Sequence, residues 1–307
     1  MNASASTELA VSTPQEAPVT SPPDRPRRLR LGRPSPWHLV LIPVTFILLV
    51  PLIWMVLTSL ETAGETHQFP PVLVPHSPQW SNYPDALHAA PFLRFMLNSA
   101  IVAVIVVASN LVLCSIAGYA FARLRFFGKG LLFGVLMLTL MVPFQVTMIP
   151  EFLIVKWLGT HVWSQLGIDH LGALAVPNMA TAFGIFFLRQ FFLTIPVELE
   201  EAARIDGTSR LGVVFKIVLP LSMPALSTLA ALTFLDSWNS FLWPLIVVSS
   251  ENHMTLPLGL STFQGSHNTN WQLLMAGNVF SLVPMLLVFF AAQRYFVRSV
   301  AATGLKG

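Results

Sequence analysis

The chain has 307 residues, of which 54% are hydrophobic and only 10% are charged. Ordinary soluble domains carry roughly 25% charged residues, so this composition excludes a soluble globular fold and indicates a polytopic membrane protein. The formal net charge of +3 does not indicate a nucleic-acid partner, because the basic residues flank apolar blocks, as membrane topology requires. The one cysteine, Cys114, excludes an intrachain disulfide and a cysteine-based metal site.

Residues 1–35 are rich in Ala, Ser, Thr and Pro without an apolar period, which predicts a disordered cytoplasmic tail. The charge-free run at 34–60 is too long for the core of a signal peptide, so we expect a retained first transmembrane helix. The remainder, 36–307, is predicted to form one all-α membrane domain with six transmembrane helices. Their expected bounds are about 37–60, 95–122, 130–149, 171–188, 217–248 and 272–293.

The basic residues predict the orientation of these helices. All but two of the 17 Lys and Arg residues fall in the two termini, the turn after the second helix and the loop between helices four and five. The two exceptions are Arg94 and Lys156. This bias places both termini and the loop at about 190–216 in the cytoplasm.

The 190–216 loop is the polar stretch between two long apolar blocks. Pro196 suits the start of a helix, and Gly207 suits its left-handed end. Leu199, Ala202 and Ala203 are expected to share one face. Thr208 or Ser209 is expected to cap a second short helix, with an apolar stripe at Leu211, Val214, Phe215 and Val218. The pattern alone leaves two interpretations open: a helix that docks onto a partner, or a hairpin that lies on lipid headgroups.

One spacing within this loop is specific. Glu201-Ala202-Ala203, then Gly207, Ile217 and Leu219-Pro220 resemble the EAA motif of ABC importer permeases in full. Further stretches resemble the carbohydrate (maltose-type) members of that family: residues 98–99, 117–126, 141–145, 149–150, 191–207, 237–244 and 302–307. The resemblance covers about residues 37–307.

The resemblance implies a multi-pass subunit of a bacterial inner membrane that pairs with a second, related permease subunit. The implied partners are also a cytoplasmic ATPase dimer, an extracytoplasmic sugar-binding protein, a carbohydrate substrate and membrane lipid. ATP and Mg would be bound by the ATPase, and this chain would bind no cofactor. The implied ATPase-coupling residues are Glu198, Glu200, Glu201, Ala202, Ala203, Asp206, Gly207, Ile217, Leu219 and Pro220.

The chain departs from the family pattern in three places. The stretch 158–174 is longer than usual, Ser240 stands where the family often has an acid, and the end reads Thr-Gly-Leu-Lys-Gly. The first departure bears on contact with the binding protein, and the second bears on the substrate.

Four residues near Ser240 are candidates for the translocation path. Asp236 and Asn239 interrupt the fifth apolar stretch and fall on one helix face, where they could bind sugar hydroxyls or form a polar clasp between helices. Trp238 and Trp243 could stack on a sugar ring or anchor the helix at the membrane interface.

The sequence contains no Walker A loop, since Gly128-Lys129-Gly130 lacks the upstream Gly and the following Ser or Thr. We therefore expect a non-catalytic subunit without a metal site. Two alternatives remain: a secondary transporter, which predicts intramembrane acids and broken helices in repeats, and a membrane enzyme or assembly scaffold.

Overall fold

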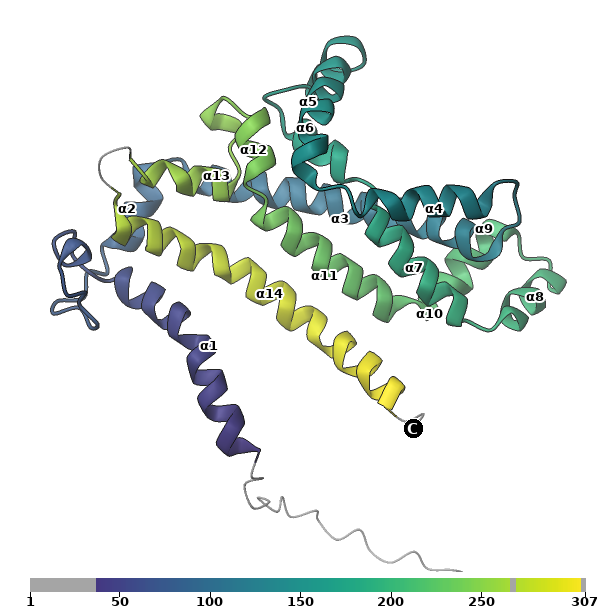
Figure 1. Ribbon diagram of the computed structural model, residues 1–307, viewed down its shortest axis with the longest axis horizontal. Helices are drawn as coiled ribbons and strands as arrows, with labels where there is room; N and C mark the ends of the chain where they lie inside the picture. Colours follow the sequence, from purple (N-terminus) through teal and green to yellow (C-terminus); the bar gives the residue numbers. More distant parts are fainter. Residues whose placement is uncertain (1–36, 266–268, 305–307) are drawn as a thin grey trace, which may run out of the picture. The chain divides into compact units, whose positions relative to one another are not determined.

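A computed structural model describes residues 37–265 and 269–304, with side chains described as far as residue 293. The predicted tail at 1–35 and the last three residues lie outside the described residues. The chain divides into two units, 1–48 and 49–307, and the helices named below lie in the second unit except for the first part of α1. The described part of the chain is helical (Figure 1). Its one β-type pairing is an isolated antiparallel bridge between Gln264 and Thr269.

Three helices are each long and apolar enough to cross a membrane: α1 (His38–Thr58), α3 (Phe92–Arg123) and the Trp271–Gln293 part of α14 (Trp271–Gly304). Three bent helix pairs raise the number of possible spans to six. The shorter helices are α2 (Asn82–Ala89), α4 (Lys129–Thr139), α5 (Phe144–His161), α6 (Leu171–Ala175), α7 (Ala182–Thr194), α8 (Val197–Ile205), α9 (Arg210–Val213), α10 (Leu219–Leu221), α11 (Met223–Asn239), α12 (Leu242–Val247) and α13 (Leu256–Leu260). This architecture agrees with the predicted all-α fold of six spans.

The third predicted helix is wrong as an unbroken element. α4 ends at Thr139, and α5 begins at Phe144 after a bend of 105° and continues to His161. Pro143 lies in this break with an extended ψ of 142°. It lacks the N–H that a continuing helix requires, and it disfavours helical backbone in the residue before it.

The fourth and fifth predicted helices are also interrupted. The fourth consists of α6, a 3-10 turn at Val176–Asn178 and α7, with a 42° bend. Thr181 begins α7 by accepting a hydrogen bond from the Gly184 N–H at 3.1 Å. The fifth is bent by 79° at Ser222, between α10 and α11. It is broken again at Ser240, whose ψ of 121° is extended, so that α11 and α12 are also separate helices.

α3 is the helix on which the others assemble, since it packs along both α7 and α11. A Cβ added at Gly118 would lie 3.2 Å from the Arg189 nitrogen, and one added at Gly184 would lie 2.7 Å from Asn110 Oδ1. Small residues at these crossings let the α3 and α7 backbones approach closely. The fully buried Asn110 also donates to the Asn178 carbonyl at 3.1 Å. α3 and α7 therefore form one rigid pair.

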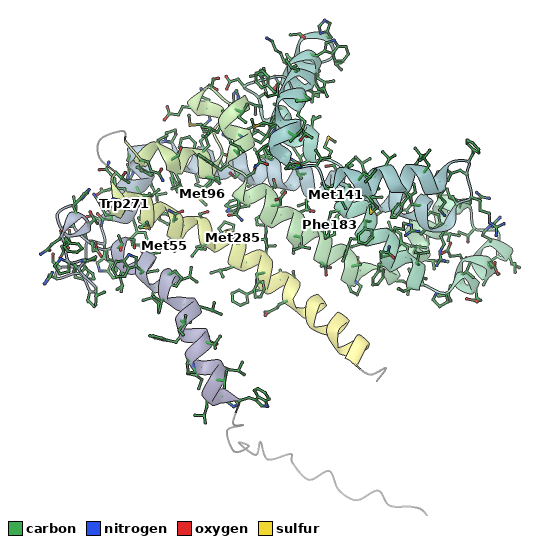
Figure 2. All side chains as sticks on the ribbon, viewed as in Figure 1. Met55, Met96, Met141, Phe183, Trp271 and Met285 are labelled. Atoms are coloured by element: carbon green, nitrogen blue, oxygen red, sulfur yellow. The ribbon has the colours of Figure 1, made fainter. Side chains whose placement is uncertain are left out.

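The outer surface of this helical unit is apolar. Met141 is 79% exposed and Phe183 is 43% exposed, and Figure 2 labels both. Exposed apolar surface on this scale requires lipid or another membrane subunit to cover it.

A polar clamp joins the loop before α6 to the loop after α12. Asp169 adopts a left-handed backbone (φ 61°). Its Oδ1 accepts hydrogen bonds from the Ser249 N–H at 2.9 Å, the Ser250 N–H at 2.8 Å and the Ser250 hydroxyl at 2.9 Å. Burial raises the pKa of the Asp169 carboxyl, but the hydrogen bonds from Ser250 and Ser249 outweigh it and hold the pKa below its ordinary value of 3.8.

A carboxyl whose pKa is lowered by folding stabilises the folded form above its ordinary pKa and loses that contribution as the pH falls. The clamp should therefore be fully formed above pH 3.8 and weaken below it.

Asp169→Asn keeps the side-chain shape and tolerates the left-handed backbone. We expect it to cost about 1 kcal/mol, because the side chain is one-third exposed. Hydrogen exchange in the 247–253 segment should rise in this variant and not in Asp85→Asn on α2. Equal exchange in both variants at neutral pH would contradict the clamp.

Candidate functional site

The first candidate site is the α8–α9 hairpin, residues 196–213. α8 ends at Ile205, and Gly207 adopts φ +83°, a left-handed conformation in which other residues are strained. The Thr208 N–H donates to the Ala203 carbonyl at 2.9 Å and the Gly207 N–H to the Arg204 carbonyl at 3.1 Å, which completes a Schellman cap. The predicted ending of the helix at Gly207 is confirmed.

The second half of the hairpin is capped by Ser209, whose hydroxyl accepts from the Gly212 N–H at 3.1 Å. α9 continues into a π-helical turn at Val214–Val218 and then into α10. Pro196 precedes α8 as its cap residue and is not its first helical residue. The hairpin therefore connects α7 to α11 by two short helices with defined ends.

A buried ion pair fixes α8 to the bundle. The Glu200 side chain is 8% exposed, and its Oε1 lies 2.7 Å from Arg123 Nε at the end of α3, in a charge contact rather than a linear hydrogen bond. The Tyr119 hydroxyl donates to Glu200 Oε2 at 2.8 Å. Arg123 Nη2 also donates to the carbonyls of Phe192 (2.8 Å) and Ile195 at the end of α7. One guanidinium thus joins α3, α7 and α8.

The opposite face of α8 is exposed. Glu198, Glu201 and Ala202 are exposed, as are Leu199 (45%) and Ile205 (87%). Ala203 instead packs into the core with Ile195 and Val213, so the expected shared face of Leu199, Ala202 and Ala203 is divided. Large exposed apolar side chains with polar residues around them are typical of a protein or membrane interaction site.

The predicted apolar stripe of the second helix divides in the same way. Val214 and Val218 are buried, whereas Leu211 (66%) and Phe215 (55%) are exposed. Of the other implied coupling residues, Asp206 and Pro220 are exposed, and Ile217 and Leu219 are partly buried. The hairpin therefore offers a continuous exposed surface from α8 to the π-helical turn.

The second candidate site is a cavity of about 420 Å³, here called the polar cavity. Its wall is built where helices are interrupted: Phe144 follows the α4–α5 break, Asn178 lies in the α6–α7 break, and Ser240 lies in the α11–α12 break. Non-helical backbone at membrane depth is tolerated where it lines a water-filled cavity. The remaining lining residues are Val102, Val106, Leu174, Asp236, Ser237, Phe241, Leu242, Trp243, Pro244 and Thr255.

The structure separates the four predicted path residues. Asp236 is exposed in the polar cavity. Asn239 lines a different hollow beside α14, and its amide donates to the Leu235 carbonyl of its own helix at 2.7 Å. The two residues therefore line different hollows and do not share one wall in this structure. Among the described residues, the Asn239 side chain makes no hydrogen bond to another helix.

The indole N–H groups of both tryptophans bind other segments of this chain. The Trp238 indole N–H donates to the Ser281 carbonyl of α14 at 3.2 Å, and the ring stacks on Phe234. Trp243 is 4% exposed, and its indole N–H donates to the Ala173 carbonyl at 3.0 Å. The Trp243 ring contacts the polar cavity, but its polar atom is engaged elsewhere.

Sequence reasoning missed Tyr119, Arg123, Asn178 and Thr255 as site residues. Arg123 carried a usable signal, since it is the first base after a charge-free stretch of 28 residues, 95–122. Asn178 and Thr255 lie in segments whose fold could not be read from periodicity. Their positions depend on helix breaks that the sequence analysis did not predict.

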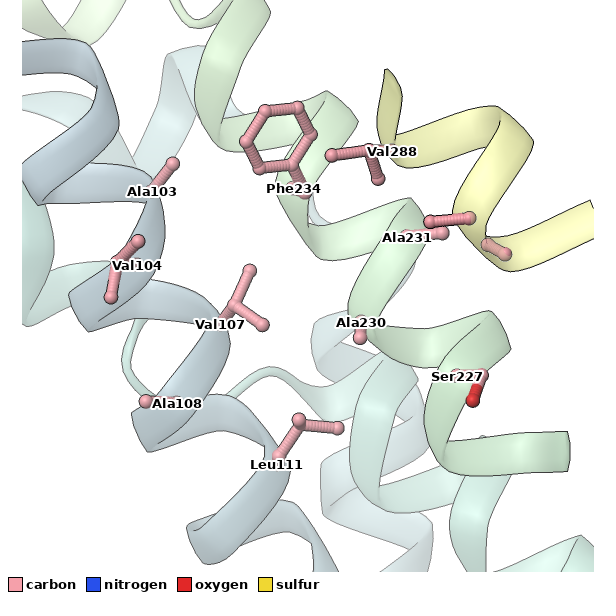
Figure 3. Close-up of a pocket in the computed structure, with 12 residues that line it drawn as sticks. Ala103, Val104, Val107, Ala108, Leu111, Ser227, Ala230, Ala231, Phe234 and Val288 are labelled. Atoms are coloured by element: carbon pink, nitrogen blue, oxygen red, sulfur yellow. The ribbon is translucent and has the colours of Figure 1, made fainter. Parts of the chain in front are cut away.

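An apolar cavity of about 540 Å³ lies between α3, α11 and α14. Ala103, Val107, Ala230 and Ala231 line it, together with Phe234 (Figure 3). Ser227 supplies the one hydroxyl among its lining residues. This apolar groove lacks the hydrogen-bonding groups that a polar substrate requires, so it is not the candidate path.

The helical membrane unit combines an exposed hairpin with a polar cavity at the helix breaks. These features are typical of a transport permease. Residues 110–302 match the family described as the binding-protein-dependent transport system inner membrane component. The chain belongs to this family, and the resemblance to ABC importer permeases is confirmed.

Individual relatives extend the match. The chain is 38% identical over 211 residues to the arabinooligosaccharides transport system permease protein AraQ of Halalkalibacterium halodurans, covering 68% of this chain and 73% of the relative. It is 36% identical to the sn-glycerol-3-phosphate transport system permease protein UgpE of Pectobacterium atrosepticum over 86% of this chain and 94% of the relative. A bacterial ABC transporter involved in the import of the acidic polysaccharide alginate shares the fold, with a TM-score of 0.71, 24% identity and coverage of 85% and 98%.

The Glu200 contact generates a prediction. Glu200→Gln keeps the side-chain volume but leaves the Arg123 guanidinium without its counter-charge, and breaking a buried pair costs about 3–5 kcal/mol. We expect hydrogen exchange in residues 196–213 to rise and that of α3 and α11 to change little. Glu201→Gln is the matched control, because this neighbouring acid is exposed. If hydrogen exchange in residues 196–213 is the same in both variants, the ion pair does not anchor α8.

Proposed function

We propose that the chain is the permease subunit of an ATP-driven importer of a carbohydrate, and that the α8–α9 hairpin couples it to a separate ATPase. The observation that carries the proposal is the hairpin geometry: one face is fixed by the Glu200–Arg123 pair, and the other face presents Glu201, Leu199 and Ile205 to a partner. The name of the arabinooligosaccharide relative supports a carbohydrate as the cargo.

The proposed partners are a second related permease subunit, a cytoplasmic ATPase dimer that binds ATP and Mg, and an extracytoplasmic binding protein. The family description supports the binding protein, and the exposed apolar surface supports a second membrane subunit. Both termini and the hairpin would face the cytoplasm, because 15 of the 17 basic residues lie on that side.

In this mechanism, closure of the ATPase on ATP displaces the hairpin. The displacement passes through Arg123 into α3, which also contributes Val102 and Val106 to the wall of the polar cavity. A 32-residue helix is about 48 Å long, so α3 spans the distance between coupling surface and path. The broken helices also fit an ion-driven transporter, but that alternative gives the hairpin no role and does not fit the family.

The carbohydrate assignment is tested by uptake. Deleting this chain should abolish uptake of the sugar that its cognate binding protein retains on purification, and restoring the chain should recover it. Unchanged uptake in the deletion strain would contradict the assignment.

The coupling assignment is tested by charge reversal. Glu201 is exposed and has no ion pair among the described residues, so Glu201→Lys should insert and fold normally. Reversing a charge at an interface disfavours the original partner by several kcal/mol. We therefore expect uptake to fall at least about tenfold, and stimulation of the ATPase by the binding protein to be lost in proteoliposomes. Asp85→Lys, at an exposed acid on α2, is the control. Normal transport by the Glu201 variant would contradict the proposed coupling surface.

A further inference from the structure

The polar cavity carries one formal charge. Among the described residues that line it, Asp236 is the single ionisable one, and the lining contains no Lys, Arg or His. Asp236 has neither an ion pair nor a hydrogen bond among the described residues. Its carboxylate is therefore not a clasp between helices, and it is available to the contents of the cavity.

The rest of the wall supplies neutral hydrogen-bonding groups and aromatic surface. Ser237, Ser240 and Asn178 line the cavity beside Phe144 and Phe241. Thr255 also lines it and is 3% exposed, and its hydroxyl has no hydrogen-bond partner among the described residues. A buried hydroxyl without a partner is costly unless water or a ligand satisfies it.

We propose that the polar cavity is a subsite for an uncharged, polyhydroxylated substrate, and that Asp236 excludes anionic substrates from it. The inference rests on the proposed function and narrows its substrate class. Hydroxyl groups would donate to the carboxylate and exchange hydrogen bonds with the Ser and Asn side chains. A phosphate or a uronate would place a second negative charge beside Asp236.

The size of the cavity makes this repulsion effective. A space of about 420 Å³ keeps any bound group close to the carboxylate. At an effective dielectric constant of about 20, two unit charges roughly 8 Å apart change an equilibrium more than tenfold. A cleft with one sign of charge and low-dielectric walls focuses this field. The chain should thus differ in cargo from its relative named for sn-glycerol-3-phosphate.

Thiol labelling measures the potential in the cavity directly. Ser240→Cys would be introduced into the full chain with Cys114→Ser, which removes the one native thiol, and labelled in membranes together with its partner subunits. The reagents are cationic trimethylammonioethyl methanethiosulfonate, anionic sulfonatoethyl methanethiosulfonate and neutral methyl methanethiosulfonate. We expect the ratio of cationic to anionic labelling rates to fall about tenfold when Asp236→Asn is added.

The controls separate the possible outcomes. Glu251→Gln removes an equal charge from an exposed turn and should leave the ratio unchanged. Ser237→Cys reports on the same cavity if the Ser240 variant does not fold. A ratio that does not respond to Asp236→Asn, or a cysteine that the neutral reagent never reaches, overturns the proposal. If Asp236→Asn changes the labelling ratio but deletion of the chain leaves sugar uptake unchanged, exclusion of anions by Asp236 is supported and the carbohydrate assignment is contradicted. If the deletion abolishes uptake but the labelling ratio does not change, only the exclusion of anions by Asp236 is contradicted.

Discussion

The contact between Arg123 and Glu200 is the interaction on which the functional architecture depends. The α8–α9 hairpin also packs into the buried apolar core through Ala203 and Val213. The guanidinium adds a buried counter-charge for Glu200 and two hydrogen bonds to the end of α7. A buried pair of this kind is weak evidence for stability, but the loss of one partner is costly because the other charge stays buried without compensation. A force on the hairpin must therefore reach α3 and α7 together.

The broken helices explain how a membrane unit of this kind can contain a path for a hydrophilic solute. Unbroken helices satisfy their own backbone groups and offer little to a hydrophilic solute. The interruptions at 140–143 and 240–241 place Phe144 and Ser240 on one cavity. Such breaks occur in transporters of more than one energy source, so they describe the path and not its driving force. The proposed driving force rests instead on the exposed face of the hairpin.

The sequence predicted what depends on local or average properties. Six apolar stretches correspond to the three long helices and the three bent helix pairs, and Gly207 and Ser209 marked the turn and cap that the structure contains. The helix breaks were not predictable, because a hydropathy window is insensitive to direction and Pro143 looks no different from a proline tolerated inside a helix, such as Pro150. Nor could Glu200 be distinguished from Glu201. Their different burial depends on Arg123, a residue distant in sequence.

The departure at Ser240 gains a physical meaning from this arrangement. The family resemblance predicts an acid at that position, and here it is replaced by a hydroxyl. Asp236 lies four residues earlier, one turn back along α11, and lines the same cavity as Ser240. Asp236 thus gives the cavity wall a carboxylate, although Ser240 supplies only a hydroxyl. This carboxylate stands on the regular helix α11, which Trp238 holds against α14 through its hydrogen bond to Ser281.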